Sequence, residues 1–166
     1  GGPGPRRSAD DRFAVFVVDT ILGASWSSRL FQEVREKRGL AYSVYSYASQ
    51  YSDAGLTAIY FGSRSEALGE AMKVILDVMS KLVDDIDDDA IEHAKNHLIG
   101  QLVLSMESPS SRMHALGRAV IMDLPVLTVD EVLAQLEAVT REDVLRAVRR
   151  YYEPRRLSTG CMGRRV

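Results

Sequence analysis

Cysteine is nearly absent from this chain of 166 residues, in which Cys161 is the only one. A lone cysteine excludes a disulfide framework within the chain and is typical of a reducing compartment, so we expect a cytoplasmic protein. Basic residues are not in excess either, because 21 lysines and arginines stand against 23 aspartates and glutamates. Nucleic acids and anionic membranes, which bind strongly basic faces, are therefore not expected as partners.

Long apolar runs are also missing, since none approaches the roughly 18–20 residues that span a bilayer. Apolar residues still make up 46% of the chain and charged residues 27%, a composition typical of globular domains. The chain opens with Gly-Gly-Pro-Gly-Pro rather than Met, and we expect it to be a piece of a longer protein. Residues 1–10 resemble turns and are expected to form a flexible segment, followed by a single α+β domain over 11–166.

Hydrophobic periodicity and turn residues predict two helices, a hairpin, five helices and a final strand, in that order. The first two helices are expected over 11–22, with a stop at Gly23, and from the cap Ser27 to a stop at Gly39. The five later helices are expected over 66–84, 88–107 and 109–122 and after the capping pairs Thr128–Glu131 and Thr140–Asp143. The strands are expected over 42–51, 56–62 and 156–162. Strands separated from a run of helices predict an α+β fold in which an antiparallel or mixed sheet carries helices on one face. Three strands are few for so many helices, so further strands are expected before Gly1.

His93 and His97 form the pair most suggestive of a metal site, because four-residue spacing places two imidazoles on one helix face. Residues 94–96 between them are Ala-Lys-Asn, so the carboxylate of the H-E-x-x-H and H-x-x-E-H zinc motifs is missing. Asn96 stands where the second motif has glutamate, and an amide cannot take a proton from zinc-bound water. We interpret the pair as a solvated helix face and assign no metal ligand within the chain.

The other two candidates for chemistry are interpreted as packing residues. His114 stands among the core-like residues 113–116, which favours a packed or hydrogen-bonded histidine. Cys161 lies in the last predicted strand with no histidine nearby, which favours a buried, inert thiol. Since G-x-S-x-G and glycine-rich phosphate motifs are also absent, the chain suggests neither a serine nucleophile nor a phosphate loop.

Residues 27–44, SSRLFQEVREKRGLAYSV, contain the most informative pattern, a helix with a glycine stop that leads into a tyrosine-rich strand. Arg35 lies in the last turn of that helix, and Tyr42 opens the strand. A guanidinium and a phenol that converge at such a junction can bind a carbonyl or a developing oxyanion. The residues alone leave two alternatives open: Arg35 can serve the helix C-terminus, and Tyr42 can be a half-buried strand residue.

Residues 21–47, ILGASWSSRLFQEVREKRGLAYSVYSY, strongly resemble the C-terminal half of the processing-peptidase-like branch of the pitrilysin/insulinase metallopeptidases. The resemblance continues in order through residues 94–98, Glu107, Arg112, 116–118 and 128–144. In this family two homologous α+β halves close around an extended peptide, and the N-terminal half holds zinc on an inverted H-x-x-E-H motif. The resemblance implies that residues 11–166 are a C-terminal half, with an N-terminal zinc-bearing half or partner subunit and an extended peptide substrate.

The family's C-terminal half contributes an arginine and a tyrosine seven positions apart, which Arg35 and Tyr42 match. By the resemblance, Tyr42 donates a hydrogen bond to the scissile carbonyl as its oxygen becomes an oxyanion, and Arg35 holds a neighbouring substrate carbonyl. Where the family often has a glycine run, this chain has Gly-Ala-Ser-Trp at 23–26, which places Trp26 at the rim of the cleft. Because H-x-x-E-H is absent, zinc belongs to the intact enzyme and this chain alone is expected to be inactive.

Two other functions are also considered. The chain can be a non-catalytic partner or scaffold subunit of the same superfamily, although retention of both Arg35 and Tyr42 argues against this. It can also be an unrelated ligand- or metal-binding module that uses His93 and His97. The sequence leaves open whether the protein acts as one two-half chain, a homodimer or a heterodimer, so a dimer is possible.

Overall fold

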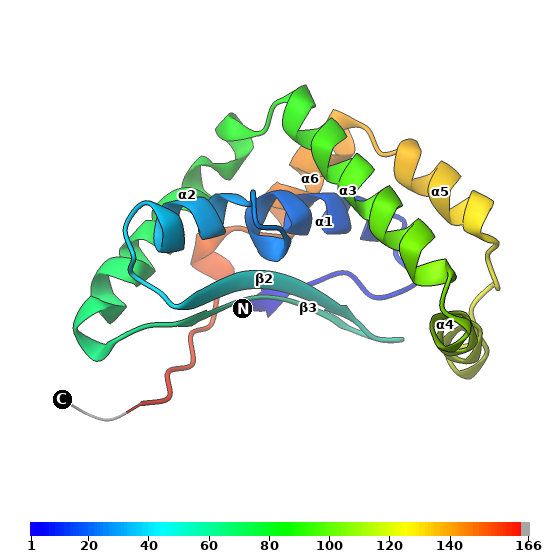
Figure 1. The fold of residues 1–166 in the computed structure, drawn as a ribbon, viewed down its shortest axis with the longest axis horizontal. Helices are drawn as coiled ribbons and strands as arrows, with labels where there is room; N and C mark the ends of the chain where they lie inside the picture. The colour runs from blue at the N-terminus through cyan, green and yellow to red at the C-terminus, as the bar shows by residue number, and fades with distance from the viewer. Residues whose placement is uncertain (164–166) are drawn as a thin grey trace.

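The computed structural model describes residues 1–163 and shows a three-stranded antiparallel sheet beneath a layer of helices (Figure 1). The sheet has the order β1-β3-β2, with β1 at Gly2–Pro3, β2 at Ser43–Gln50 and β3 at Gly55–Gly62. The α-helices are α1 (Arg12–Asp19), α2 (Leu68–Asp85), α3 (Asp88–Met106), α4 (Pro109–Ile121), α5 (Val129–Glu137) and α6 (Arg141–Tyr151). π-Helical segments cover Thr20–Ala24 and Phe31–Glu36, and 3-10 turns cover Ser65–Ala67 and Pro154–Arg156. The predicted α+β class is confirmed.

Most helix starts lie where the capping residues predict them. The Asp87 carboxylate accepts a hydrogen bond from the Ala90 N–H at 2.8 Å, so the acidic run before α3 is a helix entrance. Ser108 caps α4, which begins at Pro109, and Thr128 and Thr140 form complete capping boxes for α5 and α6. The predicted hairpin is also confirmed, with strands that pair from Ser43–Gly62 to Gln50–Gly55.

The N-terminal residues are bound to the hairpin, in contrast to the flexible segment expected over 1–10. Strand β1 pairs with β3, the Gly4 N–H donates to the Gly55 carbonyl at 2.8 Å, and the Arg7 N–H donates to the Tyr51 carbonyl at 2.9 Å. The β1 pairing and the Gly4 bond use the free edge of β3, whereas the Arg7 bond reaches the residue after β2; the turn-like composition of the segment does not reveal these contacts. The third strand of the sheet is therefore N-terminal.

The strand predicted over 156–162 is wrong, because this segment is a 3-10 turn followed by irregular backbone. Ser158 exchanges two backbone hydrogen bonds with Gly1, both of 2.8 Å, but β1 is only two residues long and no ladder forms. Cys161 consequently lies beyond the sheet and is exposed, which corrects its interpretation as a buried thiol.

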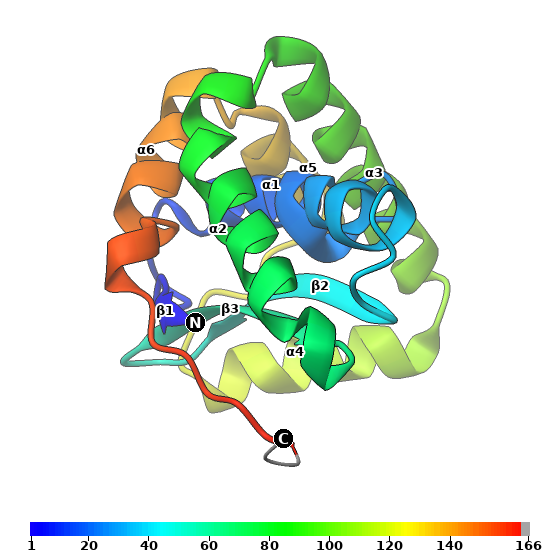
Figure 2. The ribbon, with the colours of Figure 1, turned by 90° about the vertical axis from the view of Figure 1, so that its left-hand side faces the viewer.

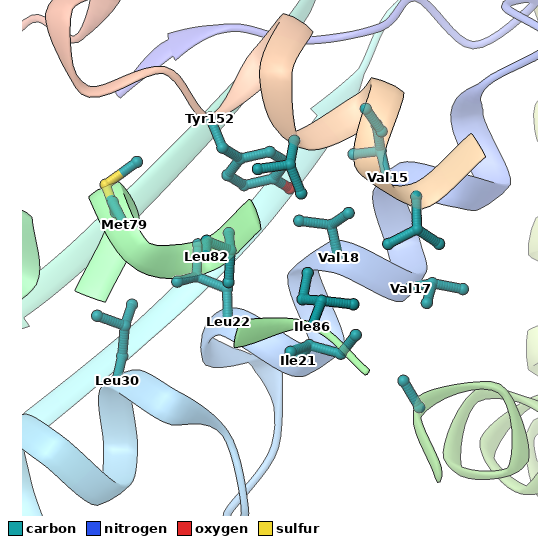
Figure 3. Close-up of a cluster of buried hydrophobic side chains, with 14 of the residues drawn as sticks. Val15, Val17, Val18, Ile21, Leu22, Leu30, Met79, Leu82, Ile86 and Tyr152 are labelled. Atoms are coloured by element: carbon teal, nitrogen blue, oxygen red, sulfur yellow. The ribbon is translucent and has the colours of Figure 1, made fainter. Parts of the chain in front are cut away.

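The core lies between the sheet and the helices α1, α2 and α6 (Figures 2 and 3). Val15, Val17, Val18 and Leu22 of α1 and the π-helical segment after it are fully buried. Gly23 is expected to stop this helix, but helical backbone continues to Ala24. The glycine instead permits close approach to the sheet, because a Cβ there would lie 2.4 Å from the backbone nitrogen of Ser46 in β2.

Alternation along the strands gives the sheet two different faces. Val44, Ser46 and Thr57 are buried beneath the helices, whereas Tyr45, Tyr47 and Tyr60 are exposed on the opposite face. The rings of Tyr45 and Tyr60 are cross-strand neighbours with centroids 5.1 Å apart. The helices therefore cover one face of the sheet, as predicted, and leave an aromatic face accessible.

Helix α4 stands apart from the other helices, beyond the end of the β2–β3 hairpin, where Figure 1 shows it end-on. None of its residues is buried. His114 and its apolar neighbours Met113 and Leu116 are exposed, so His114 is not packed in the core. The other alternative, a hydrogen-bonded histidine, agrees with the structure, in which the Ser110 hydroxyl lies 3.4 Å from its Nδ1. Within residues 1–163, every helix is too short or too polar to cross a membrane.

Candidate functional site

The candidate site is built at the end of the helix that precedes β2. Its last turns are π-helical, and the Gly39 and Leu40 N–H groups donate to the carbonyls of Arg35 and Val34 at 3.0 and 2.9 Å. Gly39 has φ of +59°, so the predicted glycine stop is confirmed. The predicted cap is wrong, because helical backbone begins at Arg29 and the Ser27 hydroxyl lies 3.2 Å from that of Ser25.

Arg35 lies among three aromatic rings. Its guanidinium carbon is 4.9 Å from the ring centroid of Phe31, 5.8 Å from that of Tyr42 and 5.9 Å from that of Trp26. The Trp26 and Phe31 rings pack edge to face with centroids 5.1 Å apart. Stacking of this kind holds a guanidinium in place while its N–H edge stays available. The side chain keeps 37% of its accessible surface, and its Nε lies 3.9 Å from Glu36 Oε1.

The neighbouring basic residues are engaged elsewhere. Lys37 and Arg38 both form ion pairs with Glu33, and these contacts hold the pKa of the Glu33 carboxyl below its ordinary value. Arg35 is therefore the basic residue at this helix end that faces the aromatic rings.

Tyr42 stands at the start of the sheet. Its N–H donates to the Gly62 carbonyl at 2.9 Å, which places the residue beside the end of β3. The side chain is 87% exposed, so the alternative of a half-buried strand tyrosine does not describe it.

The two residues line one groove of about 690 Å³. The lining residues are Arg35, Gly39, Leu40, Ala41, Tyr42, Ser43, Tyr60, Gly62, Ser63 and Arg64. Two arginines and two tyrosines thus surround a space that is open to solvent, and no carboxylate is among the lining residues from the described part of the chain. This arrangement can bind carbonyl oxygens or anions.

A larger groove of about 1100 Å³ lies between the N-terminal segment and helices α5 and α6. Several of its charged side chains are already paired, because the Asp11 carboxylate accepts hydrogen bonds from the Tyr151 hydroxyl at 3.0 Å and from Arg150 at 3.3 Å, and Arg146 forms an ion pair with Asp143. We therefore place the candidate site at the smaller groove, where the guanidinium and phenol groups are accessible.

The residues that the structure describes do not fit zinc. His93 and His97 are exposed on α3, as the interpretation of a solvated helix face predicts. Residues 1–163 contain no cluster of three or more His, Cys, Asp or Glu side chains that could hold a metal ion. Any zinc that acts with the Arg35 groove would have to be held by another part of the protein.

Sequence reasoning missed three residues of the site: Tyr60 and Arg64, which line the groove, and Phe31, which packs against the Arg35 guanidinium. The hairpin register carries the signal for two of them, because antiparallel pairing of the predicted strands returns residues 60–64 to the neighbourhood of Tyr42. Trp26, expected at the rim of a cleft, is 76% exposed beside Arg35.

Comparison with known proteins supplies the family. The family description "Peptidase M16 inactive domain" matches residues 1–98. An uncharacterized zinc protease of Streptomyces coelicolor is 41% identical over 164 residues, which cover 98% of this chain and 36% of the relative. The uncharacterized zinc protease YmxG of Bacillus subtilis is 40% identical over 133 residues, 80% of this chain and 32% of the relative.

The fold agrees with this match. The crystal structure of the peptidase M16 inactive domain from Pseudomonas fluorescens superposes with a TM-score of 0.83 at 28% identity, covering 93% of this chain and 37% of that chain. The chain spans about a third of the length of the curated relatives it matches. Since the family match covers more than half of the residues, the chain belongs to the M16 metallopeptidases and is their inactive, C-terminal domain, as residues 21–47 predict.

Proposed function

We propose that this chain is the substrate-binding half of a zinc-dependent endopeptidase, and that it contributes Arg35 and Tyr42 to an active site completed by a zinc-bearing N-terminal half. The substrate is an extended peptide. The observation that carries the proposal is that both side chains line one open groove, with the Arg35 guanidinium carbon 5.8 Å from the Tyr42 ring centroid. Relatives called zinc proteases and the M16 family match support the same reaction class.

Tyr42 has the role of an oxyanion donor. Its exposed phenol donates a hydrogen bond to the oxygen of the scissile carbonyl as negative charge develops there. Such a bond strengthens in the transition state and therefore acts mainly on turnover. The zinc of the other half, when bound, supplies activation of the attacking water.

Arg35 has the role of a peptide clamp. The rings of Trp26, Phe31 and Tyr42 hold its guanidinium group, and its N–H groups bind a main-chain carbonyl of the substrate. Because such a contact binds the peptide main chain, the enzyme can accept extended peptides with many different side chains. The motif in residues 21–47 supports a place in the processing-peptidase-like branch, and the single cysteine supports a cytoplasmic location.

The experiment compares the 166-residue chain with the longer protein that carries a zinc-bearing half, using a fluorogenic peptide and metal analysis. We expect neither cleavage nor stoichiometric zinc for the chain alone, and cleavage when the zinc-bearing half is present. Cleavage by the chain alone would contradict the proposal. Failure of the complete protein to cleave any peptide, with zinc bound, would favour the non-catalytic scaffold instead.

A further inference from the structure

The groove beside Tyr42 is positively charged. Arg35 and Arg64 are its two charged lining residues, and no aspartate or glutamate of the described chain lines it. Glu36 reaches only the Arg35 Nε, at 3.9 Å, and Glu66 lies outside the lining. A ligand that enters this groove therefore meets a positive field that is not neutralised from within.

The side chains of the two arginines differ in their contacts. The Arg35 guanidinium packs on aromatic rings, as described above. Arg64 is exposed, and its guanidinium forms none of the ion pairs found within residues 1–163. Its backbone is nevertheless held, because the Ser63 hydroxyl and the Ala67 N–H both donate to its carbonyl, at 2.9 and 3.0 Å. The Arg64 guanidinium therefore stands on a backbone held by hydrogen bonds and takes part in no ion pair of the described residues.

Gly62 leaves room for a ligand group in the groove that Arg64 and Tyr42 line. A side chain at Gly62 would begin 3.3 Å from the Ser43 hydroxyl and 3.7 Å from the Tyr60 hydroxyl, inside the groove. With hydrogen at this position, the hydroxyls of Ser43 and Tyr60 face the same space that Arg64 borders. A cation with two nearby hydroxyl donors suits an anion with several acceptor lone pairs.

We propose that Arg64, with Tyr60 and Ser43, forms a subsite for a carboxylate of the bound peptide, so that the protein prefers acidic peptides. This inference rests on the proposed function and deepens it by giving the substrate a chemical class. Arginine suits the task because its planar fork can donate two parallel hydrogen bonds to one carboxylate. The carboxylate comes from an Asp or Glu side chain or from a free peptide C-terminus, and the experiment distinguishes these sources.

The test measures binding to the 166-residue chain by calorimetry and by the fluorescence of Trp26, its only tryptophan. The probes are ten-residue alanine–serine peptides with an amidated C-terminus, which carry Glu, Gln or Lys at each position in turn. One further Gln peptide keeps its free C-terminal carboxylate. We expect the Glu or free-acid peptides to bind about three- to fivefold more tightly than Gln peptides at low salt, less so at high salt. Preference for internal Glu identifies a side-chain subsite, and preference for the free acid alone identifies C-terminal recognition.

Two variants and a control make the test specific. Arg64→Gln should abolish the preference and Arg64→Glu should reverse it in favour of Lys peptides, with unchanged thermal unfolding because the side chain is exposed. Arg149→Glu changes the net charge equally on the exposed end of α6 and should keep the preference. Equal binding of Glu, Gln and Lys peptides, or a preference that survives in Arg64→Gln, overturns the subsite but leaves the proposed function intact. Absence of any peptide binding at millimolar concentration also overturns the subsite, while the cleavage assay tests the proposed function separately.

Discussion

The guanidinium carbon of Arg35 lies 5.8 Å from the ring centroid of Tyr42, across a turn that Gly39 makes possible with its positive φ. One residue ends a helix and the other opens a strand, so their relation depends on backbone hydrogen bonds rather than on a single element. A cation at the face of a phenol ring fixes both groups at the same wall of the groove. A peptide in this groove would therefore meet both groups.

Replacing Tyr42 by Phe in the complete enzyme should lower kcat about 100- to 1000-fold with little change in KM. The phenol hydroxyl acts on charge that develops in the transition state, whereas the ring that stacks on Arg35 is retained. Steady-state kinetics with a fluorogenic peptide measures both constants. Tyr51→Phe, at an exposed tyrosine after β2, is the matched control and should be silent. If Tyr42→Phe weakens substrate binding as much as it lowers kcat, or changes neither, the phenol has only a packing role.

Replacing Arg35 by Lys should raise KM about tenfold and change kcat less. Lysine keeps the charge but loses the planar fork and the stacking on Phe31 and Trp26, which serve ground state and transition state alike. Arg38→Lys is the control, because Arg38 pairs with Glu33 away from the rings. If Arg35→Lys and Arg38→Lys behave alike, Arg35 does not clamp the peptide.

Asp19 should make the folded protein less stable as pH rises. Burial raises the pKa of its carboxyl from 3.8 to about 6, with the Ser46 hydroxyl opposing in part. The folded protein then holds this proton more tightly than the unfolded chain, so the contribution of this group to the unfolding free energy falls as pH rises from about 4 to 6. The loss amounts to about 3 kcal/mol and persists above pH 6.

Urea unfolding of the chain and of Asp19→Asn between pH 4.5 and 7.5 measures this effect. The variant should gain stability relative to the parent as pH rises, because its amide does not ionise beside the buried Tyr152, whose own pKa burial raises further. Asp77→Asn, at an exposed carboxyl that pairs with Lys81, should run parallel to the parent. If the unfolding free energy of Asp19→Asn also follows that of the parent at every pH, the Asp19 carboxyl is solvated.

Local patterns predicted much of this fold, and the failures have a common physical cause. Capping pairs such as Thr128–Glu131 and the glycine at 39 act within a few residues, so the sequence displays their chemistry directly. The errors concern long-range packing: the N-terminal residues add to the edge of β3, residues 157–163 form no strand, and α4 is not covered. Arg35 and Tyr42 were identified by their motif, whereas the contributions of Phe31 and Arg64 depend on side-chain placement.

Gly23 offers the clearest test of such a long-range constraint. Replacement by Ala should destabilise the chain by about 1–3 kcal/mol, because the new Cβ would lie 2.4 Å from the Ser46 nitrogen and 2.6 Å from its hydroxyl oxygen. The sheet cannot easily withdraw, since β2 is paired with β3 along its whole length. Gly100→Ala in α3 has nothing within 4 Å of its Cβ and should instead stabilise by about 0.5–1 kcal/mol through helix propensity. Urea midpoints of the two variants should therefore move in opposite directions. A Gly23→Ala variant as stable as the parent would mean that the segment Thr20–Ala24 and β2 are farther apart in solution.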